Sequence, residues 1–280
     1  MKSLCIKTNN EDILNFLNDS LLKLDLNDIY ISRAEFKVYK NIIVHYVGED
    51  FSRFHDNLSS IISNCVINFY EKKLLKRILE YNYFYFDGSE KKDILEVAED
   101  FIEEDLISRE DNFYSIYSAV SDYIKENKSL VLEGFVNFRL YNYMKSLDYI
   151  IDFAVNKYIT DKEYMEFINM LKLYVSFTPP KISLIHLIFL GNECILLDKD
   201  KNFIPITDEN LNAKYLSDIT FTQNDYALNT LLNLTPKKIT IHLIDKHPDE
   251  VINTIKLIFE GRCTVCSSCE LCTMYKKIVR

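Results

Sequence analysis

The sequence predicts an α+β protein, with a small sheet near each end of the chain and a helical region between them. Near both ends, apolar residues alternate with polar ones or form short β-branched runs, which is typical of strands. In the middle they recur every three or four residues, as in amphipathic helices. Only five glycines and five prolines occur in 280 residues, so long helices meet few interruptions. These observations favour mixed architecture over an all-helical fold.

The first 88 residues have the order strand, helix, strand, strand, helix. A short strand covers residues 4–8, and Asn10 begins a helix whose apolar residues recur at helical spacing. Residues 29–37 and 38–48 then predict a hairpin, with Lys40-Asn41 as its turn. A long helix starts near Asp50 or Ser52. Such an N-terminal α+β unit forms a small sheet with helices on one face.

Residues 89–178 contain no convincing strand and predict a helical region. Ser89 and Ser129 are candidate helix N-caps, because their hydroxyls can accept a backbone N–H. Thr160 and Glu163 have the spacing of a capping box and predict the start of another helix. Pro179-Pro180 ends that helix, since proline disfavours helical geometry in the residue before it.

Residues 179–262 return to a period of two and predict a C-terminal α+β unit. A meander, a helix, a strand and a second helix follow one another, with Pro248 in the first turn of that second helix. Their ranges are 182–189, 194–197 and 203–206 for the meander, 224–234 for the helix and 238–244 for the strand. Residues 263–280 remain as a Cys-rich tail.

The net charge of the chain limits the kinds of partner it can bind, and the absence of targeting segments indicates its location. A net charge of −9 argues against general nucleic-acid binding, which needs a concentrated basic face, although it leaves room for a local basic patch. The one basic run of note is interpreted as a solvated helix face, and it consists of Lys72, Lys73, Lys76 and Arg77.

No secretory signal opens the chain, and the apolar stretch 182–197 is too short and too interrupted for a membrane span. We therefore expect a cytoplasmic protein whose seven cysteines are not a disulfide framework.

Four cysteines near the C-terminus are the strongest chemical signal. They recur at every third position, as Cys263, Cys266, Cys269 and Cys272. Thiolates bind soft and borderline metals, and a two-residue gap lets neighbouring sulfurs reach one ion or cluster. The spacing resembles the first three ligands of bacterial ferredoxins, although the last gap is one residue short. Zinc sites more often separate two Cys pairs by a longer loop, so an iron–sulfur cluster is favoured over zinc and both stay open.

Two histidines form a second candidate group. His186 interrupts the apolar strand at 182–189, and His242 lies on the polar face of the strand at 238–244. If these strands pair, the two imidazoles approach each other, as in a metal site or an acid–base site. A hydrogen-bonded structural histidine is the commoner outcome. No partnered nucleophile and no phosphate-binding glycine loop accompanies them.

Three segments resemble the YtxC-like proteins, which occur in endospore-forming bacteria and are labelled putative sporulation proteins. The segments are Glu133-Gly134-Phe135-Val136-Asn137-Phe138-Arg139-Leu140, then 162–168, and Pro180-Lys181-Ile182 with Leu184 and His186. The resemblance implies a sporulation-associated protein without established enzymatic activity. It assigns no functional residues. By their own chemistry, Phe135, Phe138 and Leu140 are predicted to be core.

The leading hypothesis is thus a non-enzymatic, sporulation-associated protein with a metallated four-cysteine element that supports stability or contact with an unknown protein partner. A redox-responsive protein is the alternative, in which the same cysteines hold an iron–sulfur cluster or exchange disulfides. A third hypothesis is a hydrolase or transferase that uses His186 and His242.

Overall fold

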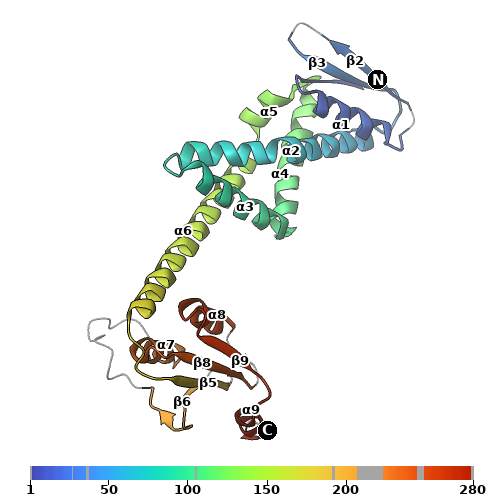
Figure 1. Cartoon of the computed structure of the whole chain (residues 1–280). Helices are drawn as coiled ribbons and strands as arrows, with labels where there is room; N and C mark the ends of the chain where they lie inside the picture. The colour runs from blue at the N-terminus through green and yellow to red at the C-terminus, as the bar shows by residue number, and fades with distance from the viewer. Residues whose placement is uncertain are drawn as a thin grey trace. The chain divides into compact units, whose positions relative to one another are not determined.

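The fold was obtained as a computed structural model that describes residues 2–26, 28–35, 38–104, 106–190, 193–206, 223–244 and 249–278 (Figure 1). It confirms the predicted α+β class. The chain forms two compact units, residues 1–160 and 161–280. The four parts expected from the sequence differ from this division, because helices on both sides of residue 88 pack together and residues 263–266 join a sheet.

The first unit combines a four-stranded sheet with a group of helices. The sheet order is β2-β3-β1-β4, in which β1 and β2 are antiparallel to β3, and β4 is parallel to β1. The last helix, α6, extends into the second unit. The elements are β1 (Lys2–Thr8), α1 (Glu11–Leu22), β2 (Ile29–Glu35), β3 (Lys40–Tyr46), α2 (Phe51–Asn82), α3 (Gly88–Glu104), α4 (Leu106–Glu126), β4 (Ser129–Val131), α5 (Leu132–Arg139) and α6 (Tyr141–Phe177).

The core of the first unit lies between one face of this sheet and the helices. Alternate residues of β1 and β3, such as Leu4, Ile6, Ile42 and Val44, are buried there. Helix α2 packs against α1, α3 and α4. The predicted strand, helix and hairpin are therefore confirmed, although Lys40-Asn41 lies within β3 rather than in the turn.

Four expectations for the middle region are wrong. Ser89 does not cap a helix, because α3 already includes Gly88 and the carboxylate of Asp87 accepts the backbone N–H groups of Ser89 and Glu90. Ser129 begins the short strand β4, which pairs with β1, and the next helix starts at Leu132. Thr160 lies inside α6, where its hydroxyl donates to the carbonyl of Asn156 at 2.9 Å instead of capping a new helix. Phe138 is 84% exposed and does not belong to the core.

The second unit is built on a five-stranded sheet of order β7-β6-β5-β8-β9. Strand β8 runs parallel to both β5 and β9, whereas β5, β6 and β7 form the predicted antiparallel meander. Pro248 and the Gly191-Asn192 connection lie outside the described residues. The elements are β5 (Leu184–Leu190), β6 (Glu193–Asp198), β7 (Phe203–Ile204), α7 (Gln223–Leu234), β8 (Lys238–Leu243), α8 (Asp249–Ile258), β9 (Cys263–Cys266) and α9 (Glu270–Ile278).

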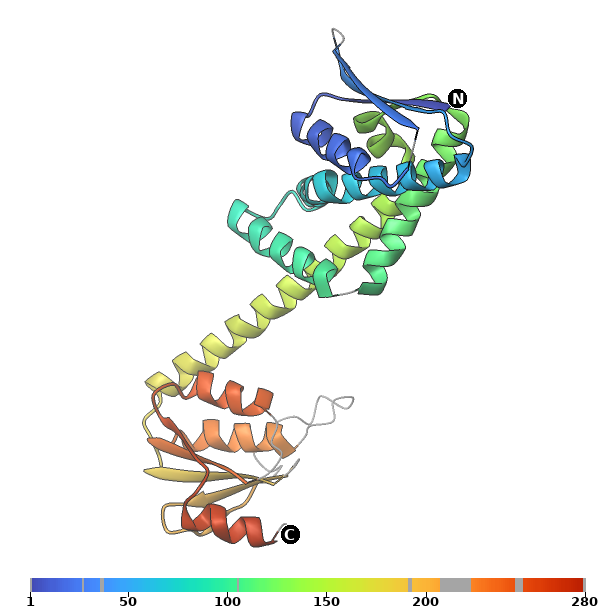
Figure 2. The same cartoon turned by 90° about the vertical axis from the view of Figure 1, so that its right-hand side faces the viewer.

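The two faces of this sheet are covered differently. Helices α7 and α8 lie on one face and the short helix α9 on the other (Figure 2). Residues of β5, β6 and β8 alternate between an extensive apolar cluster under α7 and α8 and a small cluster under α9. The buried members of the small cluster are Ile188, Leu197, Ile244, Leu271 and Cys272. Within the described ranges, no helix has the length and apolar character required to cross a membrane.

Candidate metal centre

Strand β8 and the segment from the end of β9 into α9 bring one histidine and three cysteines together beneath α9. His242 and Cys266 are direct neighbours in the parallel pairing of β8 with β9, so their side chains leave the sheet on the same face. Cys269 precedes α9, and its carbonyl accepts the N–H of Thr273 at 3.0 Å. Cys272 lies in the first turn of α9.

The candidate ligand atoms of these residues form a tight group. The Sγ of Cys272 is 3.6 Å from the Sγ of Cys269 and 3.9 Å from that of Cys266. The Nδ1 of His242 is 3.3 Å from the Sγ of Cys272 and 3.4 Å from the Sγ of Cys269. All four ligand atoms lie within 4.8 Å of one another. Three sulfurs and one imidazole nitrogen are therefore close enough together to bind one metal ion.

The surroundings of the thiols tune their ionisation in opposite directions. The backbone N–H groups of Ser268 and Cys269 hold the pKa of Cys266 below its ordinary value, because they stabilise the thiolate. Burial raises the pKa of Cys272 to about 11. The thiol of Cys266 is thus the readier of the two to ionise, and that of Cys272 needs a compensating positive charge.

The two histidines meet as the pairing of their strands requires. Because β5 and β8 are parallel neighbours, the Nδ1 of His186 lies 3.0 Å from the Nε2 of His242. Burial lowers the pKa of both rings, so the neutral imidazole is favoured in each. If a metal ion takes the Nδ1 of His242, the proton of this ring lies on Nε2, which then donates the hydrogen bond to the Nδ1 of His186. This is the arrangement by which a second histidine orients a metal ligand.

Cys263, the first cysteine of the predicted set, lies outside this group. It is three residues before Cys266 in the same strand, and side chains at that separation leave a strand on opposite faces. Its Sγ lies 3.9 Å from the carbonyl of Ile255 and packs with the apolar cluster under α7 and α8. Burial raises the pKa of this thiol to about 11. The structure thus brings together three of the four predicted cysteines.

His242 was predicted to meet His186 but not the cysteines. The sequence gives no sign that β9 pairs with β8 or in which register. Strand β9 is only the short segment Cys-Thr-Val-Cys, and no tight turn joins it to its partner strand. Had residues 263–266 been assigned as a strand, its period of two would have separated Cys263 from Cys266. The chemistry of the group is that of a site for a tetrahedral ion with sulfur and nitrogen ligands.

Comparisons with known proteins identify the family, whose profile does not extend to Cys266, Cys269 and Cys272. The profile of the YtxC-like family matches residues 56–264, which include His186, His242 and Cys263 and end before Cys266. A protein from Bacillus subtilis (strain 168), described as "Uncharacterized protein YtxC", is 24% identical over 203 residues, covering 69% of this chain and 70% of that protein. No solved structure matches the chain significantly.

Proposed function

This chain belongs to the YtxC-like family, and we propose that Cys266, Cys269, Cys272 and His242 bind one structural zinc ion in it. The observation that carries the proposal is the spacing of the ligand atoms. Two thiolates at about 2.3 Å from one tetrahedral zinc ion lie roughly 3.8 Å apart. The sulfur–sulfur distances of 3.6 Å and 3.9 Å match that separation.

The same distances disfavour an iron–sulfur cluster. In a 4Fe–4S or a 2Fe–2S cluster the ligands are divided among different iron atoms, so some of them lie farther apart than the 4.8 Å within which all four ligand atoms of this group fall. An imidazole in the fourth position also fits a Cys₃His zinc site. The redox alternative predicts that Cys269 and Cys272 form a disulfide, which requires their sulfurs to approach from 3.6 Å to bonding distance.

The proposed ion has a structural role rather than a catalytic one. Four protein ligands complete a tetrahedral shell, whereas catalytic zinc keeps one position for water or substrate. The apolar cluster between α9 and the sheet is small, and α9 has only nine residues. Short elements with little apolar contact often depend on a metal for their stability. We therefore assign the ion the role of holding α9 against β8 and β9.

Metal analysis of the full chain, purified without oxygen, tests this proposal. We expect one zinc and no iron or acid-labile sulfide per chain. The variant Cys266→Ser should lose the zinc, and Cys263→Ser, which changes the thiol on the opposite face of the same strand, should keep it. Stoichiometric iron with sulfide, a chain without metal, or equal loss in both variants contradicts the proposed site.

We also propose that the protein acts in the cytoplasm during sporulation, together with a protein partner. The support is the resemblance to the YtxC-like proteins, to whose family this chain belongs. In the organism that carries this chain, the Cys266→Ser allele should lower the yield of heat-resistant spores relative to the Cys263→Ser allele. A normal spore yield after deletion of the whole gene rejects this role without affecting the proposed metal site.

A further inference from the structure

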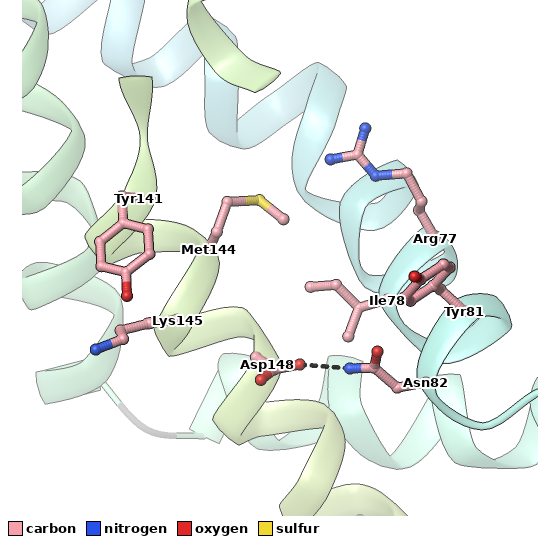
Figure 3. Close-up of a pocket in the computed structure, with 8 residues that line it drawn as sticks. All are labelled: Arg77, Ile78, Tyr81, Asn82, Tyr141, Met144, Lys145 and Asp148. Atoms are coloured by element: carbon pink, nitrogen blue, oxygen red, sulfur yellow. Dashed lines mark hydrogen bonds between the residues drawn. The ribbon is translucent and has the colours of Figure 1, made fainter. Parts of the chain in front are cut away.

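A groove in the first unit, remote in sequence from the metal centre, lies between the C-terminal half of α2 and the beginning of α6. It has a volume of about 490 Å³. Ile78 of α2 and Met144 of α6 point into the space between these helices (Figure 3). One end is closed by a hydrogen bond of 2.8 Å from the Nδ2 of Asn82 to the Oδ1 of Asp148. The groove therefore offers an apolar floor in a size range that accepts large side chains.

Exposed aromatic rings surround this floor. Tyr81 on α2 is 84% exposed and Tyr141 on α6 is 67% exposed, and both line the groove. Phe138, which the sequence predicted to be core, ends up exposed shortly before Tyr141. A packed unit seldom leaves several large aromatic side chains together in water. Tyrosine in particular is enriched where one protein binds another, because its ring adds apolar area and its hydroxyl can stay hydrated.

The lining of the groove carries two positive charges and one negative charge, although the chain as a whole carries −9. Arg77 and Lys145 line it, and neither forms an ion pair with a described residue. Arg77 donates to the neutral side chain of Asn137 at 2.6 Å, and the ammonium of Lys145 lies 5.0 Å from the ring centre of Tyr141. The single carboxylate among the lining residues is Asp148, which accepts from Asn82. Two cations are thus available to an incoming acidic group.

We propose that this groove binds an acidic peptide segment of a partner protein, with one large apolar side chain of the segment seated between Ile78 and Met144. Carboxylates beside that side chain would pair with Arg77 and Lys145. The planar guanidinium of Arg77 can form two parallel hydrogen bonds with one carboxylate. In such a complex the apolar floor contacts the large side chain of the peptide, and the two cations of the groove contact its carboxylates. Self-association through this groove is less favourable because two acidic chains repel each other.

Single-stranded nucleic acid is the other class of ligand that aromatic and basic side chains attract. Binding of that kind needs a line of cations that follows the phosphate backbone. Here Lys76 pairs with Glu80 and Lys72 pairs with Glu99, which leaves a short positive region rather than a continuous track. The groove therefore favours the acidic peptide.

Selection of peptides from a displayed library of random short sequences, with the full chain as bait, tests the proposal. We expect enriched peptides to carry Asp or Glu beside Leu, Phe or Trp. Binding of a selected peptide, measured by fluorescence polarisation, should weaken at least about tenfold in Arg77→Glu/Lys145→Glu and in Tyr81→Ala/Tyr141→Ala. Tyr30→Ala, which removes a tyrosine that is 61% exposed on β2, should leave it unchanged.

A charge exchange makes the test sharper. The Arg77→Glu/Lys145→Glu variant should bind the same peptide once its acidic residues are replaced by lysine, because the attraction is then restored with opposite signs. The proposal is overturned if selection yields no acidic peptides, if the selected peptides bind both double variants as tightly as the unchanged chain, or if a single-stranded RNA oligonucleotide occupies the groove instead.

Discussion

The two faces of the C-terminal sheet are stabilised by different means, although the same strands build both. Under α7 and α8, residues such as Leu187, Ile241 and Ile255 form an extensive apolar cluster. Under α9, a few apolar residues accompany His242 and three cysteines. Hydrophobic burial suffices where two helices cover a face. A single short helix offers less apolar area, and there we propose that a metal supplies what packing does not.

Cys263 and Cys266 show this difference within one strand. Both belong to β9, yet the thiol of Cys263 packs among apolar side chains and that of Cys266 faces backbone N–H groups and other sulfurs. Residue type alone therefore does not identify a ligand. The face of the sheet on which a cysteine lies decides its role.

The largest effect is expected from Cys272→Ser, since Cys272 is buried and contacts every other candidate ligand. We expect loss of zinc and a decrease of about 4 kcal/mol or more in the free energy of unfolding, because the metal contribution disappears. Urea unfolding with parallel metal analysis measures both quantities. The matched control is Cys194→Ser, a buried thiol on the apolar face, which should keep its zinc. Equal zinc loss in the two variants would remove the distinction between the faces.

Ile241→Ala tests the opposite face of β8, one residue from His242. Ile241 is fully buried in the cluster under α7 and α8. Its truncation should cost about 2–5 kcal/mol of unfolding free energy through lost burial and the resulting cavity. The folded variant should still hold one zinc per chain. A folded variant without zinc would mean that packing on the apolar face controls metal binding on the opposite face.

A smaller effect is expected from His186→Ala, because His186 orients His242 without contacting the thiols. Loss of the 3.0 Å hydrogen bond should weaken zinc binding about 10–100-fold while the fold persists. Competition with a chelator of known affinity measures the change. His45→Ala provides a control, since His45 accepts or donates its hydrogen bond with Ser3 in the first unit. Unchanged affinity in His186→Ala would reduce that histidine to a packing role.

The smallest effect concerns pH. The pKa of Cys272 in the metal-free site is raised to about 11, so this thiol is protonated near neutral pH and must lose its proton when zinc binds. His242 has a lowered pKa and is already neutral there. Zinc affinity should therefore fall about tenfold per unit of acidification between pH 8 and pH 7 from the Cys272 proton alone. Affinity that stays constant over this interval would contradict thiolate ligation by Cys272.

The sequence predicted the fold class and most elements, because periodicity records burial locally. It failed where tertiary pairing overrides local pattern. Ser129 resembles a helix cap, yet β1 offers a strand partner to residues 129–131. Thr160 and Glu163 have capping spacing, although the helix passes through them without interruption.

The sequence alone predicted that the cysteines lie together. It predicted that the two histidines meet only on the condition that their strands pair. The spacing of Cys266, Cys269 and Cys272 is local and visible in the chain. The approach of His186 to His242 depended on pairing of their strands, which the fold confirms. Exclusion of Cys263 and inclusion of His242 both require the β8–β9 register, and strand order is not encoded in any single segment.

X-ray absorption at the zinc edge of the anaerobically purified chain tests the central claim most directly, because it counts the atoms bound to the metal. We predict three sulfurs at about 2.3 Å and one nitrogen at about 2.0–2.1 Å. The same spectrum should persist in Cys263→Ser. Four sulfurs without nitrogen, or iron in place of zinc, would contradict the assignment of His242 and of the face beneath α9 as the metal centre.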